Sequence, residues 1–331
     1  MKFSPTPEHM LFSRHDPEDP RLGEFVSTEA LPGATGIQAP ITLWGYADDE
    51  GIQINGGRIG AAEGPDRIRH SLYRMTPFRH WPRINLFHDR GNIRPSHFSL
   101  EERHALGREA VRQHYREDPG FLVTLGGGHD YGFPDGAGFL DEFVHARPKP
   151  LILNFDAHLD VRPVDRGLTS GTPFRRLIEQ FGTQFELVAI GIQPQCNSPF
   201  HWEWAISQGI QILTLETIRN QDGPGGLQMA LSECLDVDSK RPVWISLDMD
   251  VFSSREAPGC SATWPTGLAA EEVLRLLPWI HSNFSVKGMG IYEVSPPLDQ
   301  DGKTAKLAAL VIYQALNQVL RGQSENSATP P

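Results

Sequence analysis

Four short segments of the sequence are rich in side chains that bind divalent metal ions. In chain order they are GGGHD at 126–130, DAHLD at 156–160, DMD at 248–250 and the single residue Glu293. Carboxylate oxygens with a minority of imidazole nitrogens, and no thiolate, favour Mn²⁺ over a structural Zn²⁺. The potential ligands are His129, Asp156, His158, Asp160, Asp248 and Asp250.

Taken alone, two of these segments have ordinary structural explanations. A glycine-rich turn after a strand often only lets the chain bend, and 126–130 lacks the Gly-Lys-Ser/Thr ending of a phosphate loop. Asp248 and Asp250 fit solvated acids at the end of a strand. The segment 156–160 is different, because side chains alternate along a strand and its three ionisable residues share one face. Carboxylates gathered this closely repel one another unless cations lie between them.

The segments follow short apolar runs that alternate with helical patterns. This alternation predicts a doubly wound, mostly parallel sheet, in which ligands bind at the carboxyl ends of the strands. All four segments then lie at one edge, and their ligand count suggests two metal ions roughly 3.5 to 4 Å apart. The apolar runs are 41–46, 84–87, 121–125, 151–155, 185–192, 210–215, 243–247 and 286–292, and clear helical patterns lie at 99–115, 271–280 and 304–320.

Length and composition predict one globular domain. A chain of 331 residues with 39% apolar residues is long enough for a substantial core. The proline-rich and acidic segment 1–40 predicts an irregular N-terminal arm, and 322–331 predicts a disordered tail. The catalytic domain is therefore expected at 41–321.

Charge and cysteine usage exclude several classes of protein. The net charge of −11 and the lack of a basic block argue against binding to nucleic acid or a membrane surface. No run reaches the ~18 apolar residues of a membrane span, and the N-terminus does not resemble a secretory signal. Three distant cysteines indicate no disulfide framework, so a cytoplasmic protein is expected. The sequence leaves open whether the chain forms a homo-oligomer.

The ordered set GGGH, DAHLD, SLDMD and YEVSPP resembles the arginase, agmatinase and formimidoylglutamase superfamily, over nearly the whole chain from about 41 to 320. The resemblance implies an α/β fold, a three-layer sandwich with a central eight-stranded, mostly parallel sheet. It also implies two Mn²⁺ ions per subunit and a small amidine or guanidine substrate, which Glu293 would hold. One ion would be bound by His129, Asp156, Asp160 and Asp248, and the other by Asp156, His158, Asp248 and Asp250, with Asp156 and Asp248 shared.

The segments between the ligands look most like those of formimidoylglutamases. The relevant segments are 49–69, 169–177, 257–268 and 296–309. The likeness implies hydrolysis of N-formimidoyl-L-glutamate to formamide and L-glutamate, a reaction of histidine degradation. The loop 170–174 reads SGTPF and lacks the histidine that arginases and agmatinases usually carry there. Asp160, as a metal ligand facing the bridging hydroxide, would accept a proton from it and pass that proton to the departing nitrogen.

This substrate carries two carboxylates, so its pocket needs cationic side chains. Arginine binds a carboxylate through two parallel hydrogen bonds. Arg162 is our first candidate, because in DAHLDVR it shares the strand face of Asp160 by parity. Arg58 and Arg175 are second choices.

Other functions remain open at this stage. An arginase, an agmatinase or a guanidino-acid hydrolase would use the same metals on a different substrate tail. A metallophosphatase is a more remote alternative, because its Gly-Asp-x-x-Asp and Gly-His-x-His elements are absent. A non-catalytic metal-binding relative would show degenerate ligands, and none of the six is degenerate.

Overall fold

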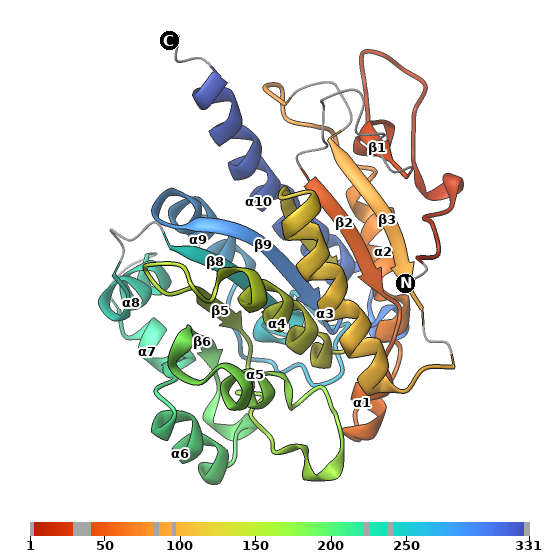
Figure 1. Ribbon diagram of the computed structural model, residues 1–331. Helices are drawn as coiled ribbons and strands as arrows, with labels where there is room; N and C mark the ends of the chain where they lie inside the picture. Colours follow the sequence, from red (N-terminus) through yellow and green to blue (C-terminus); the bar gives the residue numbers. More distant parts are fainter. Residues whose placement is uncertain are drawn as a thin grey trace.

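A nine-stranded sheet forms the centre of the protein, between two layers of helices (Figure 1). The computed structural model describes residues 3–28, 41–81, 86–94, 97–221, 225–236 and 241–327. Neighbouring strands are parallel throughout, in the order β1-β3-β2-β4-β9-β8-β5-β6-β7. The strands are β1 (Val26–Ser27), β2 (Ile41–Tyr46), β3 (Phe87–Ile93), β4 (Phe121–Leu125), β5 (Leu151–Phe155), β6 (Glu186–Ile192), β7 (Gln211–Thr214), β8 (Pro242–Asp248) and β9 (Ser285–Tyr292).

The predicted α/β sandwich is confirmed, with one strand more than the eight expected. Every predicted apolar run except 84–87 forms a strand within one residue of its predicted bounds. The additional strand, β1, pairs with β3 at Val26 and lies in the segment for which an irregular arm is predicted. Two residues carry too little apolar periodicity to be recognised as a strand from sequence.

Strand β3 begins at Phe87, where the predicted run 84–87 ends, and residues 84 and 85 lie outside the described part of the chain. Its sequence, FHDRGNI, is too polar to predict a buried strand. The buried Asp89 is nevertheless stabilised there, because Arg69 donates to both of its carboxylate oxygens at 2.8 and 2.9 Å. The Tyr73 hydroxyl adds a third hydrogen bond at 2.6 Å. A fully paired buried charge of this kind is tolerated where an unpaired one is not.

Successive residues of the central strands pack into opposite layers. On β5, Ile152 belongs to one apolar core and Leu153 to the other, and Trp244 and Ile245 divide in the same way on β8. This alternation follows from the two-residue period of a strand and explains why runs buried on both faces are almost wholly apolar. Helices α3 to α6 pack on the Ile152 face, and α2 and α7 to α10 pack on the Leu153 face.

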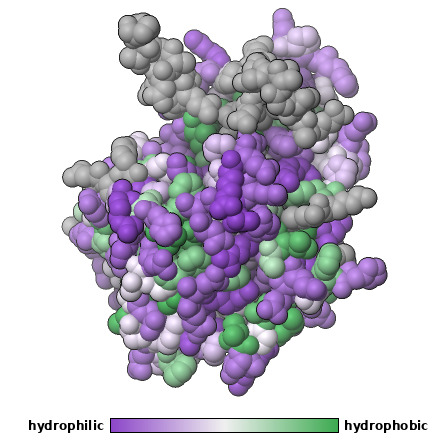
Figure 2. Space-filling model, viewed as in Figure 1, coloured by the Kyte–Doolittle hydropathy of each residue, from purple (hydrophilic) through white to green (hydrophobic). Residues whose placement is uncertain are grey.

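The helices present polar residues outward, so the face over α3 and α4 is largely hydrophilic (Figure 2). Helix α3 begins with a capping box, in which Ser99 Oγ accepts from the Glu102 N–H and Glu102 accepts from the Ser99 N–H. The helices are α1 (Glu50–Ile54), α2 (Gly64–Leu72), α3 (Leu100–Glu117), α4 (Gly132–Phe143), α5 (Pro173–Phe181), α6 (Pro199–Ser207), α7 (Leu215–Arg219), α8 (Gly226–Cys234), α9 (Ala270–Asn283) and α10 (Lys303–Ser327).

The two ends of the chain contain more regular structure than predicted. The described part of the N-terminal arm, 3–28, contains two short 3₁₀ helices besides β1, and 29–40 lies outside the described residues. Helix α10 continues to Ser327, which is beyond the start of the predicted tail 322–331, whose last four residues are not described. Within the described residues, every helix is too short or too polar to cross a lipid bilayer.

Candidate metal centre

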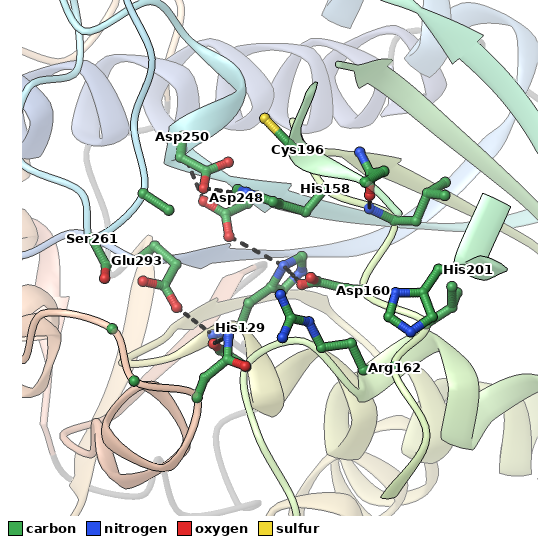
Figure 3. Close-up of a pocket in the computed structure, with 18 of the residues that line it drawn as sticks. His129, His158, Asp160, Arg162, Cys196, His201, Asp248, Asp250, Ser261 and Glu293 are labelled. Atoms are coloured by element: carbon green, nitrogen blue, oxygen red, sulfur yellow. Dashed lines mark hydrogen bonds and ion pairs between the residues drawn. The ribbon is translucent and has the colours of Figure 1, made fainter. Parts of the chain in front are cut away.

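The four polar segments meet because the strands before them are neighbours in the middle of the sheet. Strands β4, β9, β8 and β5 lie side by side in that order and run in the same direction. Their carboxyl ends therefore deliver His129, Glu293, Asp248 and Asp156 to one edge. Figure 3 shows His129, Asp248 and Glu293 around a common cavity. The arrangement expected for a parallel sheet is the one observed.

One group of potential ligands surrounds the His129 imidazole. Its Nδ1 atom lies 3.1 Å from Asp156 Oδ2, 3.0 Å from Asp160 Oδ2 and 3.2 Å from Asp248 Oδ2. These four atoms are mutually close enough to hold a single ion. They come from three different strand ends, so the group exists only in the folded protein.

A second group surrounds the His158 imidazole. Its Nδ1 atom lies 3.3 Å from Asp156 Oδ1 and 3.1 Å from Asp250 Oδ2. Asp156 thus places one carboxylate oxygen in each group. The resemblance implies that Asp248 is also shared. Its Oδ2 atom lies in the first group, and its Oδ1 atom accepts a hydrogen bond from the backbone N–H of Asp250 at 2.8 Å.

The geometry of the first group fits a divalent cation. His129 Nδ1 is buried and forms no hydrogen bond, although three carboxylate oxygens lie within 3.2 Å of it. Ion–ligand distances of about 2.1 Å are typical of such cations, and adjacent octahedral ligands are then about 3 Å apart. The observed spacing between ligand atoms is therefore that of a coordination shell. The donor set of oxygens and imidazole nitrogens suits Mn²⁺.

Neighbouring groups hold the ligands in these orientations. The other ring nitrogen of His129, Nε2, lies 2.9 Å from Ser246 Oγ, and the ring stacks on Tyr292 at a centroid distance of 4.8 Å. The backbone N–H of His158 donates to Asp156 Oδ1 at 2.7 Å, and this hydrogen bond orients the Asp156 carboxylate. Outer contacts of this kind commonly fix the tautomer and direction of metal-binding side chains.

Asp160 and Glu293 have left-handed backbone conformations, with φ values of 49° and 65°. Residues other than glycine seldom adopt this region, and they do so mainly where the surrounding structure compels them. Glu293 is held from both sides, because its N–H donates to Gly127 O at 2.9 Å and its Oε1 accepts from the His129 N–H at 3.1 Å. The strain lies at two residues that face the cavity.

Crowding raises the pKa values of several carboxyl groups. Burial and the neighbouring Asp156 carboxylate raise the pKa of Asp160 to about 6. Burial, together with Asp250 and Asp156, raises the pKa of Asp248 well above its ordinary range. Burial also raises the pKa of Glu293 to about 8, against the opposing effect of the His129 N–H. Bound cations would offset this crowding, because they favour the deprotonated form of each carboxyl group.

The cavity above the ligands has a volume of about 510 Å³. The three predicted arginines have different positions and contacts around it. Arg162 lines the cavity and forms no ion pair with a described residue. Arg58 also lines it, but its guanidinium donates to the Cys260 and Ser261 carbonyl oxygens and so holds that loop in place. Arg175 does not line the cavity. Its guanidinium pairs with Glu179 and lies 3.9 Å from the Trp204 ring centroid.

The loop after β6 also lines the cavity, and the sequence analysis did not select it. Asn197 Oδ1 accepts from the Leu159 N–H at 2.8 Å, and its Nδ2 donates to Ala157 O at 3.0 Å, so this side chain supports the ligand loop 156–160. Cys196 and His201 face the cavity from the same segment. The available signal was position, since these residues follow a predicted strand, but none of them belongs to a recognised motif.

Comparisons with known proteins agree with this geometry. The sequence profile of the "Arginase family" matches residues 39–317. A formimidoylglutamase of Citrobacter koseri is 34% identical over 277 residues, which cover 83% of this chain and 84% of that protein. The solved formimidoylglutamase of Bacillus subtilis superposes with a TM-score of 0.78 at 26% identity, covering 93% of this chain and 94% of that one. Trypanosoma cruzi formiminoglutamase with Mn²⁺ gives a TM-score of 0.76 at 26% identity, covering 91% and 99%.

The chain belongs to the arginase family, because the sequence profile of that family matches most of the chain. Within that family it is a formimidoylglutamase-like hydrolase. The predicted cofactor is also confirmed at this level, since related structures carry Mn²⁺ and the chain has two candidate metal-binding groups.

The shared carboxylate leads to a prediction about metal content. Asp156→Asn should lose most of both ions, because Asp156 contributes an oxygen to each group. Asp250→Asn should keep about half of the wild-type manganese, since Asp250 belongs to one group only. Mass spectrometry of dialysed, Mn²⁺-loaded protein would measure this. Asp141→Asn, which changes an aspartate paired with Arg108 on the surface, should keep full metal content. Equal metal loss in the Asp156 and Asp250 variants would contradict the assignment of a shared ligand.

The raised pKa values predict how the stability of metal-free protein depends on pH. A carboxyl group whose folded pKa lies above its unfolded pKa contributes stability at low pH and loses it as pH rises through the folded value. With Asp160 at a pKa of about 6 and Glu293 at about 8, the melting temperature should fall between about pH 5 and pH 8. Added Mn²⁺ should raise the melting temperature more at pH 8 than at pH 5, because ligands bind when deprotonated. Differential scanning fluorimetry would test this, and a metal-free melting temperature that rises over this range would contradict it.

Proposed function

We propose that the protein hydrolyses N-formimidoyl-L-glutamate to formamide and L-glutamate. The likeness to formimidoylglutamases over most of both chains supports this substrate. The observation on which the proposal mainly rests is the double group of ligands with an unpaired arginine at its margin. A metal pair can activate water, and the arginine matches the acidic tail of the substrate.

In this proposal, the first ion would be held by His129, Asp156, Asp160 and Asp248. The second would be held by Asp156, His158 and Asp250, with Asp248 as the further ligand that the resemblance implies. When bound, a pair of divalent ions supplies hydroxide at neutral pH by lowering the pKa of water. Hydrogen bonds and ring contacts already orient three of these side chains, His129, Asp156 and Asp248. Such pre-organisation reduces the rearrangement needed at the moment of reaction.

Asp160 and Glu293 are proposed to act on the substrate itself. The amidinium is cationic and planar, and the Glu293 carboxylate at the cavity wall accepts its N–H groups and orients its carbon. Asp160 accepts the proton that the hydroxide oxygen carries after it has bonded to the amidine carbon, and passes this proton to the departing nitrogen of glutamate. Its place beside the first group of ligand atoms and at the cavity wall supports this role.

The proposed reaction is tested by a substrate panel. Mn²⁺-loaded protein should release formamide from N-formimidoyl-L-glutamate faster than it releases urea from arginine, agmatine or guanidino acids. Formamide, urea and ammonia would be measured separately, so that deimination is distinguished from hydrolysis to formamide. Agmatine as the best substrate would overturn the proposal, although the metal groups would remain.

Recognition of the substrate carboxylate is assigned to Arg162. Arg162→Lys should lower kcat/KM for N-formimidoyl-L-glutamate roughly tenfold or more, because an ammonium cannot reproduce the planar double hydrogen bond. A hydrogen bond to a charged group contributes ~1.5 to 3 kcal/mol, which sets this scale. Metal content should not change. Arg275→Lys is the control, because Arg275 pairs with Glu271 on an exposed part of α9. Unchanged kinetics in the Arg162 variant would remove this residue from the substrate site.

A further inference from the structure

A second cavity, the second compartment, shares lining residues with the cavity over the metal ligands, the first compartment. The first compartment measures about 510 Å³ and the second about 410 Å³. Asn55, Arg162 and His201 line both, so these three side chains form the boundary between them. Figure 3 shows Arg162 and His201 on the same side of the first compartment, away from Asp250 and Glu293.

The two compartments differ in charge. The first contains four of the acidic groups discussed above, whereas the second is lined by Arg162, Arg166 and His201, with Asp165 as the acidic group among its lining residues. Neither arginine forms an ion pair with a described residue. Both side chains are exposed, and two guanidinium groups at one cavity provide donors that suit an anion.

His201 lies in the first turn of helix α6. The N-cap of the helix is Ser198, which accepts from the His201 N–H at 3.2 Å and lines the first compartment. The start of a helix carries a partial positive charge. Burial and the charges of Arg162 and Arg175 lower the pKa of the His201 imidazole, an effect that a bound anion would offset.

The chemistry of the proposed substrate matches these two compartments. In N-formimidoyl-L-glutamate the α-carboxylate is attached to the carbon that bears the amidine nitrogen, and the side-chain carboxylate lies two methylenes further away. With the amidine over the metal ligands, Arg162 at the boundary is placed for the nearer carboxylate. The farther carboxylate then needs a separate partner, and Arg166 lines the compartment that shares Arg162 with the first.

We propose that the second compartment binds the side-chain carboxylate of the substrate, with Arg166 and His201 as specificity-determining residues. This inference rests on the proposed function, since it assumes a substrate with two carboxylates. In this proposal, residues that are not metal ligands make the protein prefer a substrate with a glutamate side chain over one with an uncharged side chain.

The experiment compares two substrates that differ only at the end of the tail. They are N-formimidoyl-L-glutamate and N-formimidoyl-L-norvaline, in which a methyl group replaces the side-chain carboxylate. The wild type should favour the glutamate compound at least tenfold in kcat/KM. Arg166→Gln and His201→Phe should each reduce this preference several-fold, because each removes one partner of the carboxylate. Arg275→Gln and His70→Phe, at positions outside both compartments, should keep the wild-type preference.

A binding measurement separates this inference from the proposed reaction. Calorimetric titration of Mn²⁺-loaded protein should show tighter binding of L-glutamate than of L-norvaline, with the difference reduced in both variants. If glutamate is preferred in this way but no formimidoyl compound is hydrolysed, the compartment is supported and the proposed function fails. If the wild type hydrolyses both compounds equally, or if neither variant changes the preference, the second compartment does not bind this carboxylate and the inference is overturned.

Discussion

Electrostatic repulsion among buried aspartates is the constraint on which the rest of this structure depends. Asp156, Asp160, Asp248 and Asp250 place their oxygens close to two imidazoles at the ends of the central strands. Without cations this arrangement is unfavourable, as the raised pKa values of Asp160 and Asp248 indicate. A scaffold must therefore hold the ligands in place against their own repulsion, and a parallel sheet covered on both faces provides one.

The scaffold achieves this through close packing and paired polar groups beneath the site. Asp135 of α4 accepts hydrogen bonds from Tyr46, Thr124 and Tyr292 at 2.5 to 2.6 Å, which ties α4 to three strands. At Gly127 a Cβ atom would lie 1.6 Å from Asp48 O, so only glycine allows the turn before His129 to approach so closely. Tight packing of this kind also forces the left-handed conformation on Glu293 and keeps its carboxylate toward the cavity.

Acidic groups lie at one end of the cavity and arginines at the other. An acidic protein can therefore bind a substrate with two carboxylates. The acidic end of the cavity suits metal ions and a cationic amidine, and Arg162, Arg166 and His201 suit carboxylates at the other end. Net charge says little about such a site, because the local arrangement of charged groups sets the potential that a small ligand meets. The proposed substrate carries a cationic amidine at one end, which matches the acidic groups, and carboxylates at the other, which match the arginines.

The sequence by itself determined the central strands, the six candidate ligands and the family. The apolar runs before DAHLD and DMD are buried on both faces and lead directly into the ligands. The alternation predicted for 156–160 is not observed, because β5 ends at Phe155 and Asp160 has a left-handed backbone conformation. The sequence did not predict the polar strand β3, because the partner of Asp89 is Arg69 on a different element. It ranked Arg58 and Arg175 equally as second choices, yet one binds loop carbonyls and the other stacks on Trp204. It did not select Asn197, His201 or Arg166. Periodicity reports which way a strand residue points, but what a loop side chain meets depends on contacts between distant segments, and only the tertiary structure decides those.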